Sequence, residues 1–269
     1  MKTFVVSLKR AKNRYAYIRQ HVAGRKLDYK IIDAVDGSLL TEKEIEENCN
    51  MEQVDKYRWW LSNGAIGCAL SHLNAYEEFL ATGDKAAFII EDDVLLPETI
   101  TDLLLEIENE IKPSEIILLY YASFAPAKFS TIGERKLSNS GLYYPIDPKQ
   151  TITAAAYVIG RTAALNLKEN IRPIEVTADS WEHYYAKGFF ESLRVQYPSF
   201  ISIKNFKSSI DYHEFGSIKH KISTFINDYK IPVLYQLLKH KRKKQLDKML
   251  NHFSLTDEPS PIYQKMLNQ

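Results

Sequence analysis

Short apolar runs of strand length alternate with helical patterns over residues 3–200, and this alternation constrains the fold more than any other feature of the chain. The runs are rich in β-branched and aromatic residues, as in Thr3–Leu8, and lack the apolar–polar alternation of a strand with one face in water. Most are followed by a longer stretch with apolar residues at helical intervals, such as residues 64–83. We therefore predict an α/β sheet domain.

The boundaries of these elements follow from turn and capping signals. The predicted strands cover residues 3–8, 28–37, 85–90, 114–122, 153–160 and 192–198. The predicted helices cover residues 9–22, 41–49, 64–83, 98–111, 161–168 and 178–188. Thr41 followed by Glu44 has the spacing of a capping box, which marks a helix start. Residues 124–150, rich in Ser, Gly, Pro and Lys, form either an irregular excursion or a small hairpin.

The composition changes after residue 213. From there to Leu250 the chain carries nine Lys or Arg and three Asp or Glu. We therefore predict an α/β domain over residues 1–213 and a helical basic C-terminal extension over residues 214–269.

Cysteine usage and hydropathy point to the cytoplasm. The two cysteines, Cys49 and Cys68, have no disulfide or metal-site spacing, which favours a reducing compartment. The first apolar run is too short for a signal peptide, and no other reaches the roughly 18 residues of a transmembrane helix.

Three consecutive carboxylates follow the apolar strand at residues 85–90. In open α/β sheets, ligands bind beyond the carboxyl ends of the strands. Side chains two apart on an extended segment point the same way, so Glu91 and Asp93 would converge on one point. Mg²⁺ and Mn²⁺ prefer oxygen ligands and can hold phosphate oxygens at the same time. The alternative is that Glu91, Asp92 and Asp93 only end a strand and cap a helix in solvent.

Five segments, in this order and spacing, resemble glycosyltransferase family 25, the lipooligosaccharide galactosyltransferase family of Gram-negative bacteria. They span roughly residues 3–210 and read FVVSLKRAKNR, IIDAVDG, GAIGCALSHLNAYEEF, FIIEDDV and TAAAYVIGRTAALNL. The resemblance implies a GT-A-like Rossmann-type domain over residues 1–213, with a DxD-type motif at Glu91, Asp92 and Asp93 that departs from the strict pattern at Glu91. It also implies transfer from UDP-galactose or a similar donor, with inversion at the sugar carbon.

The predicted donor site lies where the first two strands end. An arginine there could pair with the diphosphate through its planar fork, although a solvated helix face is the plainer reading. Asp36, like Asp33, could accept a hydrogen bond from uracil or ribose, or simply form a turn. In the family-like motif GAIGCALSH, Gly64 and Gly67 would allow close backbone approach. The predicted donor-binding residues are Ser7, Leu8, Arg10, Arg14, Asp36, Ser71, His72 and Asp92.

Transfer also needs a base away from the metal. We predict Asp179 in that role, with Glu182 as second choice; the alternative for Asp179 is that it caps the helix that follows. His213 would complete the metal shell of Glu91 and Asp93, because glycosyltransferases of this fold often recruit a late ligand. Trp181, next to Asp179, is the aromatic residue likeliest to stack on a sugar ring rather than to lie in the core. The other candidates are Trp59, Trp60, Tyr184 and Tyr185.

The basic segment LKHKRKK, residues 238–244, suits an anionic membrane surface, where each Lys or Arg contributes about 1 kcal/mol. This would place the protein on the cytoplasmic face of the inner membrane, beside a lipooligosaccharide acceptor. The rival interpretations are a solvated helix end or a nucleic-acid patch, and no nucleic-acid-binding motif accompanies the segment. Two other functions remain open: a metal-dependent phosphohydrolase using the same carboxylates, and a non-catalytic carbohydrate-binding module.

Overall fold

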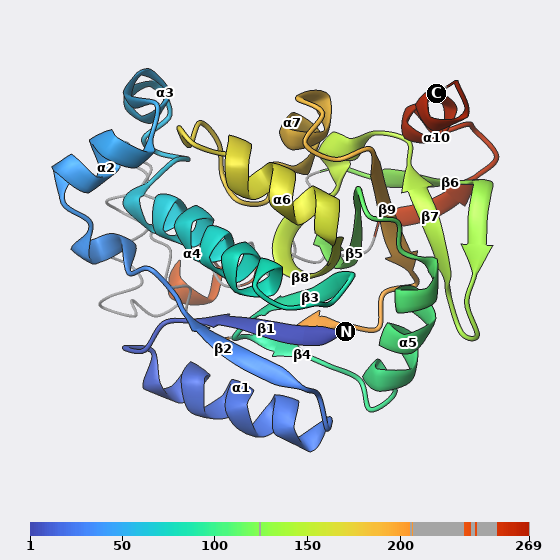
Figure 1. Ribbon diagram of the computed structural model, residues 1–269, viewed down its shortest axis with the longest axis horizontal. Helices are drawn as coiled ribbons and strands as arrows, with labels where there is room; N and C mark the ends of the chain where they lie inside the picture. The colour runs from blue at the N-terminus through green and yellow to red at the C-terminus, as the bar shows by residue number, and fades with distance from the viewer. Residues whose placement is uncertain (124, 205, 207–233, 238–239, 241–251, 269) are drawn as a thin grey trace.

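A nine-stranded sheet covered by helices on both faces forms the body of the molecule (Figure 1). The computed structural model describes residues 1–123, 125–204, 206, 234–237, 240 and 252–268. The strands lie in the order β11-β6-β7-β9-β5-β8-β3-β1-β2. The predicted α/β class is confirmed.

The principal sheet contains β1 (Lys2–Ser7), β2 (Tyr29–Asp33), β3 (Ala86–Glu91), β5 (Glu115–Ala122), β6 (Ala127–Lys136), β7 (Gly141–Pro145), β8 (Ile152–Gly160), β9 (Ser192–Tyr197) and β11 (Phe253–Thr256). A second sheet pairs β4 (Val94–Leu95) with β10 (Ser202–Ile203). The helices of the described residues are α1 (Lys12–Gly24), α2 (Glu42–Asn48), α3 (Met51–Lys56), α4 (Asn63–Leu80), α5 (Ile100–Glu110), α6 (Arg161–Asn170), α7 (Trp181–Ala186) and α10 (Pro261–Leu267), with 3-10 turns η1 (Gly37–Leu39) and η2 (Pro148–Gln150).

The direction of the strands fixes where the functional edge lies. β2, β1 and β3 run parallel, so their carboxyl ends meet at one edge. β8 is antiparallel to both of its neighbours, β3 and β5. Within the predicted segment 124–150, of which the structure describes residues 125–150, β6 and β7 form an antiparallel hairpin, as one of the two predicted alternatives had it, and both strands join the principal sheet.

Two apolar cores lie on opposite faces of the sheet. Helices α4, α6 and α7 cover one face, with Ile66 and Trp181 almost fully buried. Helices α1 and α5 cover the other, with Ile18 and Ile107 buried (Figure 1). Each such side chain contributes about 1.5–3 kcal/mol on removal from water. Burial on both faces explains why the strands read as continuous apolar runs.

Serine and threonine caps place the helices that border this edge. The Thr41 side chain accepts a hydrogen bond from the Glu44 backbone N–H, and the Glu44 carboxylate accepts one from the Thr41 backbone N–H. The predicted capping box is therefore confirmed. Ser62 accepts a bond from Ala65 N–H at the start of α4. Such caps contribute about 1 kcal/mol each and fix the residue at which a helix begins.

Gly37 and Gly67 let α4 approach the loop that follows β2. A Cβ atom on Gly37 would lie 2.0 Å from the carbonyl oxygen of Asn63. A Cβ atom on Gly67 would lie 2.8 Å from both the Gly37 nitrogen and the Val35 oxygen. These contacts are between backbones, which cannot move aside as a flexible side chain would. The sequence expectation that Gly67 permits close approach is therefore confirmed.

Gly37→Ala is expected to lower the free energy of unfolding by about 1–3 kcal/mol, the usual range for overpacking. The matched control is Gly24→Ala at the end of α1, where an added Cβ meets nothing within 4 Å. The control should change stability by no more than about 0.5–1 kcal/mol, in the stabilising direction if at all. Urea denaturation of both variants measures the difference, and equal midpoints would show that the contact relaxes freely.

The last described residues, 252–268, pack on the principal sheet. β11 runs parallel to β6 at the sheet edge, and Ile262 of α10 is buried in the core beside β7 and β9. The predicted division at residue 213 falls outside the described residues and stays a prediction. Residues 252–268, which the prediction assigned to the extension, therefore belong to the α/β fold itself.

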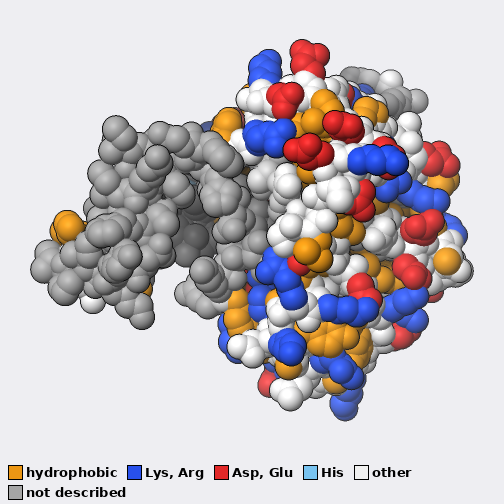
Figure 2. Space-filling view, turned by 90° about the vertical axis from the view of Figure 1, so that its left-hand side faces the viewer, with side chains coloured by type: hydrophobic (Ala, Val, Ile, Leu, Met, Phe, Trp, Pro, Cys, Tyr) orange, Lys and Arg blue, Asp and Glu red, His pale blue; other side chains and the backbone are white. Residues whose placement is uncertain are grey.

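Among the described residues, no helix is both long enough and apolar enough to cross a membrane. Figure 2 shows one side of the molecule, on which Lys and Arg side chains lie interspersed with Asp and Glu side chains over the described surface. This mixture agrees with the net charge of +1.

Candidate functional site

A pocket of about 530 Å³ lies at the carboxyl ends of β1, β2 and β3, where the sequence predicted the donor site. Its walls come from the loops after these strands, the first turns of α4, and the segment after β10. The predicted site residues that line it are Ser7, Leu8, Arg10, Arg14, Asp36, Ser71, Glu91, Asp92 and Asp93. Residues from four separate segments thus meet in one cavity.

Asp92 is buried and fully engaged. Ser7 donates a hydrogen bond to its Oδ2 at 2.7 Å, and the Arg14 guanidinium donates to Oδ1, with Nε at 2.6 Å. Burial raises the pKa of Asp92, while Arg14 and Ser7 act against this rise. With both oxygens occupied, Asp92 holds Arg14 in place at the pocket wall.

Asp93 differs from its neighbour in having a spare oxygen. Arg14 Nη2 donates to Oδ2 at 3.0 Å, but Oδ1 is buried without a hydrogen-bond partner. Burial and then the charge of Glu91 raise the pKa of Asp93 to about 7, against the pull of Arg14. A buried acceptor without a partner costs free energy. A cation or donor in the pocket would satisfy it.

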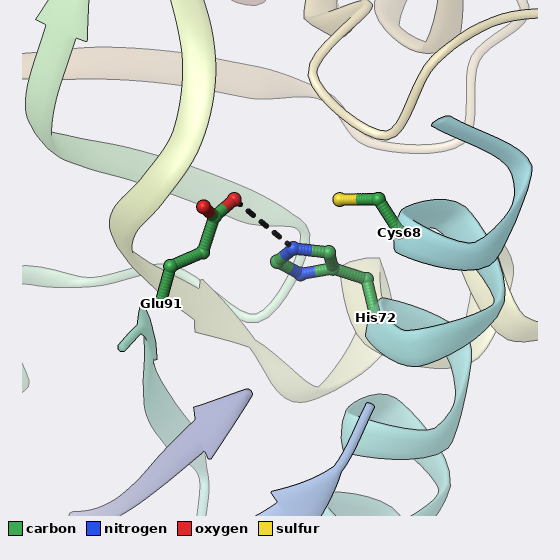
Figure 3. A group of neighbouring side chains, drawn as sticks. All are labelled: Cys68, His72 and Glu91. Carbon is green, nitrogen blue, oxygen red and sulfur yellow. Dashed lines mark ion pairs between the residues drawn. The ribbon is translucent and has the colours of Figure 1, made fainter. Parts of the chain in front are cut away.

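Glu91 points toward a pair of residues on α4 (Figure 3). Its Oε1 lies 3.8 Å from Nε2 of His72, one turn after Cys68. The expectation that His72 lines the donor pocket is not met: the residue is 1% exposed and sits behind the wall that Cys68 and Ser71 form. The spacing of Cys68 in the sequence does not indicate a metal site, and its place beside Glu91 was missed.

Arg10 and Asp36 also line the pocket. Arg10 pairs with Asp36, which also accepts bonds from the Ser38 hydroxyl at 2.6 Å and the Ser38 N–H at 3.0 Å. Burial alone would raise the pKa of Asp36, but the bonds from Ser38 and Arg10 outweigh it and lower the pKa. Asp36 is therefore an ionised acceptor at the pocket wall, as the prediction of a uracil or ribose contact requires.

The start of α4 faces the same cavity. Asn63 and Gly64, in its first turn, line the pocket. Backbone N–H groups in the first turn of a helix lack intrahelical partners and favour anions. Ser71, one turn deeper than Gly67, accepts from the Val35 N–H at 2.8 Å and so ties the helix to the loop after β2.

The segment after β10 covers the acidic corner, and no sequence pattern predicted it. Lys204 N–H donates to the carbonyl of Asp93 at 2.8 Å, and its ammonium lies 4.1 Å from the centre of the Tyr17 ring. Phe206 lies over the Arg14 guanidinium at 6.0 Å. Ile203, Lys204 and Phe206 all line the pocket.

Asp179 lies in the loop before α7, outside the set of residues that line the pocket. Its carboxylate accepts from the Thr177 hydroxyl at 2.6 Å and the Thr153 N–H at 3.2 Å. It is close enough to Cys68, on the pocket wall, for its charge to raise the pKa of that thiol. The cap of α7 is Ser180, and no side chain bonds there, so Asp179 does not cap this helix.

Aromatic residues near Asp179 belong to the core. Trp181 is 1% exposed and donates from Nε1 to the Thr153 carbonyl, which leaves no face for a sugar. Tyr184 is also buried, and Tyr185 is half-buried. Trp59, by contrast, is 52% exposed, just before the pocket residues Ser62 and Asn63. The prediction of Trp181 as the aromatic residue likeliest to stack on a sugar was therefore wrong, and Trp59 is the one with an open face.

Three other predicted features lie away from the pocket or outside the described residues. Glu182 faces Lys149 at 3.9 Å and is not a pocket residue. His213 lies outside the described residues, and so does most of the basic segment at 238–244.

Several known proteins are similar in sequence to this chain. A "Putative glycosyltransferase" of Haemophilus influenzae is 26% identical over 179 residues, which is 66% of this chain and 61% of that protein. Human procollagen galactosyltransferase 2 is 28% identical over 118 residues, 42% of this chain and 19% of that protein. Human inactive glycosyltransferase 25 family member 3 is 31% identical over 96 residues, 34% of this chain and 16% of that protein. The chain thus spans only about a fifth of each human relative.

A solved structure described as a "Putative Glucose-1-Phosphate Thymidylyltransferase" from Bacillus anthracis aligns with 78% of this chain and 98% of its own, at a TM-score of 0.39 and 14% identity. The model of glycosyltransferase family 25 (LPS biosynthesis protein) matches residues 1–181 of the 269 in the chain. This match includes β1, β2, β3, the start of α4 and the three carboxylates, all of which build the pocket. The chain therefore belongs to glycosyltransferase family 25.

Proposed function

We propose that this chain transfers galactose, or another hexose, from a UDP-sugar to a sugar of a lipooligosaccharide, with inversion at the transferred carbon. The family description names LPS biosynthesis, and a human relative is named a galactosyltransferase. The observation that carries the proposal is the pocket itself. It joins Asp93, with its unpartnered buried oxygen, to Arg10, Arg14 and the first turn of α4.

The acidic corner fits a divalent cation through two of its three carboxylates. Asp93 Oδ1 has no hydrogen-bond partner, and Glu91 lines the same pocket without a close one. Asp92 is the least available of the three, because it is buried and Ser7 and Arg14 already bond its two oxygens. Glu91 and Asp93 would hold Mn²⁺ or Mg²⁺, which prefer such oxygens. When bound, the cation would neutralise charge on the diphosphate of the departing UDP.

The chain's own residues would position the donor. Arg14 lines the pocket beside Asp92 and Asp93, with which it pairs, and a guanidinium suits phosphate oxygens. The free N–H groups at the start of α4 favour the same negative charge. Asp36, kept ionised by Ser38 and Arg10, is placed to accept a hydrogen bond from the nucleoside. Holding donor and acceptor in line supplies much of the remaining rate.

Asp179 is the proposed base. Its hydrogen bonds from Thr177 and Thr153 fix the direction of the carboxylate but leave lone pairs on both oxygens. Thr153 itself holds a φ of 93°, a strained value for a β-branched residue. Such strain persists only where the surrounding contacts hold the backbone firmly, and strained residues are found preferentially at functional sites. An acceptor hydroxyl within hydrogen-bond reach would lose its proton to Asp179.

The acceptor would be met at a membrane surface. We propose a cytoplasmic protein that contacts the anionic inner membrane through the basic segment 238–244, which contributes about 1 kcal/mol for each Lys or Arg near the surface. Nucleic acid is not a proposed partner.

The proposal is tested by incubating the protein with Mn²⁺ and a panel of UDP-sugars and following UDP release with and without lipooligosaccharide. We expect release that depends on Mn²⁺, on one UDP-sugar and on the acceptor. A metal-dependent phosphohydrolase would instead release phosphate without any acceptor.

A second candidate is a non-catalytic family member, which the similarity to a human protein named inactive favours. It predicts sugar or nucleotide binding without turnover. Calorimetric binding of UDP, combined with no release from any donor and acceptor pair, would support it over transfer.

A further inference from the structure

Cys68, His72 and Glu91 place a sulfur, a nitrogen and an oxygen ligand atom next to one another at the back of the pocket (Figure 3). The three atoms all lie within 4.8 Å of one another. Cys68 and His72 are four residues apart on α4, so they share one face of the helix. Glu91 reaches them from the end of β3. Neither Cys68 nor His72 has a role in the proposed transfer.

His72 supplies the second observation. It is 1% exposed, and its Nδ1 is bound to the Tyr157 hydroxyl at 2.8 Å, which is bound in turn to Tyr76 at 2.9 Å. Its Nε2 points toward Glu91 and Cys68 without a hydrogen-bond partner. A buried polar atom without a partner is unfavourable. A hydrogen bond that fixes one ring nitrogen while the other faces a cation is the usual arrangement of metal-binding histidines.

The kind of atom selects the metal. Thiolate and imidazole favour Zn²⁺, whereas Mg²⁺ and Mn²⁺ favour oxygen. Tetrahedral zinc, with bonds of about 2.0–2.3 Å, holds its ligand atoms about 3.4–3.6 Å apart. The 3.8 Å between His72 Nε2 and Glu91 Oε1 requires only a small inward movement of this pair, and Cys68 Sγ, within 4.8 Å of both, must also move inward to reach bonding distance. Because Cys68 and Glu91 also line the pocket, the fourth position of such a site faces the cavity.

We propose that Cys68, His72 and Glu91 form a zinc site whose fourth coordination position opens into the donor pocket. On binding, zinc takes the place of the Cys68 thiol proton, which leaves to solvent, and the ligand is the thiolate. In the metal-free protein, burial and the charges of Glu91 and Asp179 raise the pKa of this thiol. The same two charges attract a cation to the site.

Sharing of Glu91 links zinc to the proposed transfer. A zinc ion held by Cys68 and His72 would use Glu91 as its third ligand. Glu91 would then not be available to bind Mn²⁺ or Mg²⁺ together with Asp93. Zinc would therefore inhibit the Mn²⁺-dependent reaction. This consequence rests on the proposed function, whereas the zinc site does not.

The site is tested with Co²⁺, which replaces zinc and absorbs visibly. We expect one equivalent to give the d–d bands of tetrahedral cobalt and a thiolate-to-cobalt charge-transfer band in the near ultraviolet. Cys68→Ser should abolish the charge-transfer band and weaken zinc binding by at least about 100-fold, since even outer-shell changes give about 10–100-fold. The matched control is Cys49→Ser, which removes the other of the two cysteines and should leave the band unchanged.

A second variant guards against misfolding of the first. Tyr157→Phe keeps the ring but removes the hydroxyl that orients His72, and should weaken zinc binding by about 10–100-fold. Absence of a thiolate band in the wild-type protein, or its survival in Cys68→Ser, would overturn the proposal. The first result would mean that His72 instead turns slightly to hydrogen-bond Glu91.

The inhibition is measured separately. Stoichiometric zinc should slow transfer by the wild-type protein, while the rate of Cys68→Ser should respond to zinc at least about tenfold less, each relative to its own zinc-free rate. If cobalt binds as expected but no donor is turned over, the zinc site stands and the proposed transfer fails. If transfer occurs and cobalt shows no thiolate band, the reverse holds.

Discussion

Asp93→Asn is expected to abolish Mn²⁺-dependent UDP binding and to lower the rate of sugar transfer by about a thousandfold or more. A metal ion stabilises charge in the transition state by several kcal/mol, and each 1.36 kcal/mol is a factor of ten in rate. Asp93 is the carboxylate with a buried, unpartnered oxygen in the pocket, so its charge is the one most available to a cation. Asp93→Ala should give the same loss.

The loss should not come from unfolding. Burial and the charge of Glu91 raise the pKa of Asp93 to about 7, so ionised Asp93 is less favourable in the folded protein than in the unfolded chain at neutral pH. Removing that charge should leave the melting temperature unchanged or slightly raised. Asp92→Asn is the contrasting variant: burial raises the pKa of Asp92 as well, so loss of its charge should likewise spare the melting temperature, but Asp92 holds Arg14 rather than a cation, and Mn²⁺ binding should survive. Full activity of Asp93→Asn with Mn²⁺ would remove Asp93 as a ligand.

Asp179→Asn should lower the rate of transfer by about 10²–10⁴-fold, the range that general base catalysis contributes, and leave UDP binding intact. Asparagine keeps one oxygen, which can accept from the Thr153 N–H, and its amide N–H can donate to the Thr177 hydroxyl, but it cannot take up the acceptor proton. The measurements are single-turnover transfer and calorimetric binding of UDP. Transfer at the wild-type rate would exclude Asp179 as the base.

Glu182→Gln is the matched control for this variant. Glu182 lies three residues further along the chain, faces Lys149, and does not line the pocket. It should transfer sugar at the wild-type rate. If Glu182→Gln instead loses transfer while Asp179→Asn keeps it, the base is Glu182, and the side chain must turn away from Lys149 in the complex.

The alternation of strands and helices predicted the sheet well because both of its faces are buried. A strand covered on both sides reads as a continuous apolar run, and Ala86–Ile90 and Ile116–Leu119 do so. The capping boxes and turns set local boundaries through contacts three residues apart, which a sequence shows directly. The edge where the carboxylates gather followed from the parallel direction of β1, β2 and β3.

Strand direction elsewhere could not be predicted. The run TAAAYVIG identifies β8 as a buried strand, but apolar content is the same whichever way a strand runs, and β8 proved antiparallel to both neighbours. The pairing of β4 with β10 joins residues more than a hundred positions apart through two short strands, each too short to show a pattern. Lys204 and Phe206 entered the pocket wall through that pairing.

The site was predicted in its residue types and partly in its roles. Ser7, Arg14 and the three carboxylates meet as expected, but only the structure shows that Arg14 engages Asp92 and leaves one oxygen of Asp93 open. Helical spacing placed His72 on α4 without showing that its ring turns toward Tyr157 rather than into the cavity. Trp181 shows the same limit, since an aromatic residue in a polar segment can still be core.

The placement of β9 has a practical consequence for anyone who trims the chain to its recognisable portion. The family match ends at residue 181, yet β9 is threaded between β5 and β7, and β11 borders β6. A polypeptide ending at residue 181 would lack β9, an interior strand of the sheet. The backbone edges of β5 and β7 would then be unpaired, and unpaired strand edges promote aggregation. The segment that matches the family is therefore shorter than the segment that the sheet requires in order to fold.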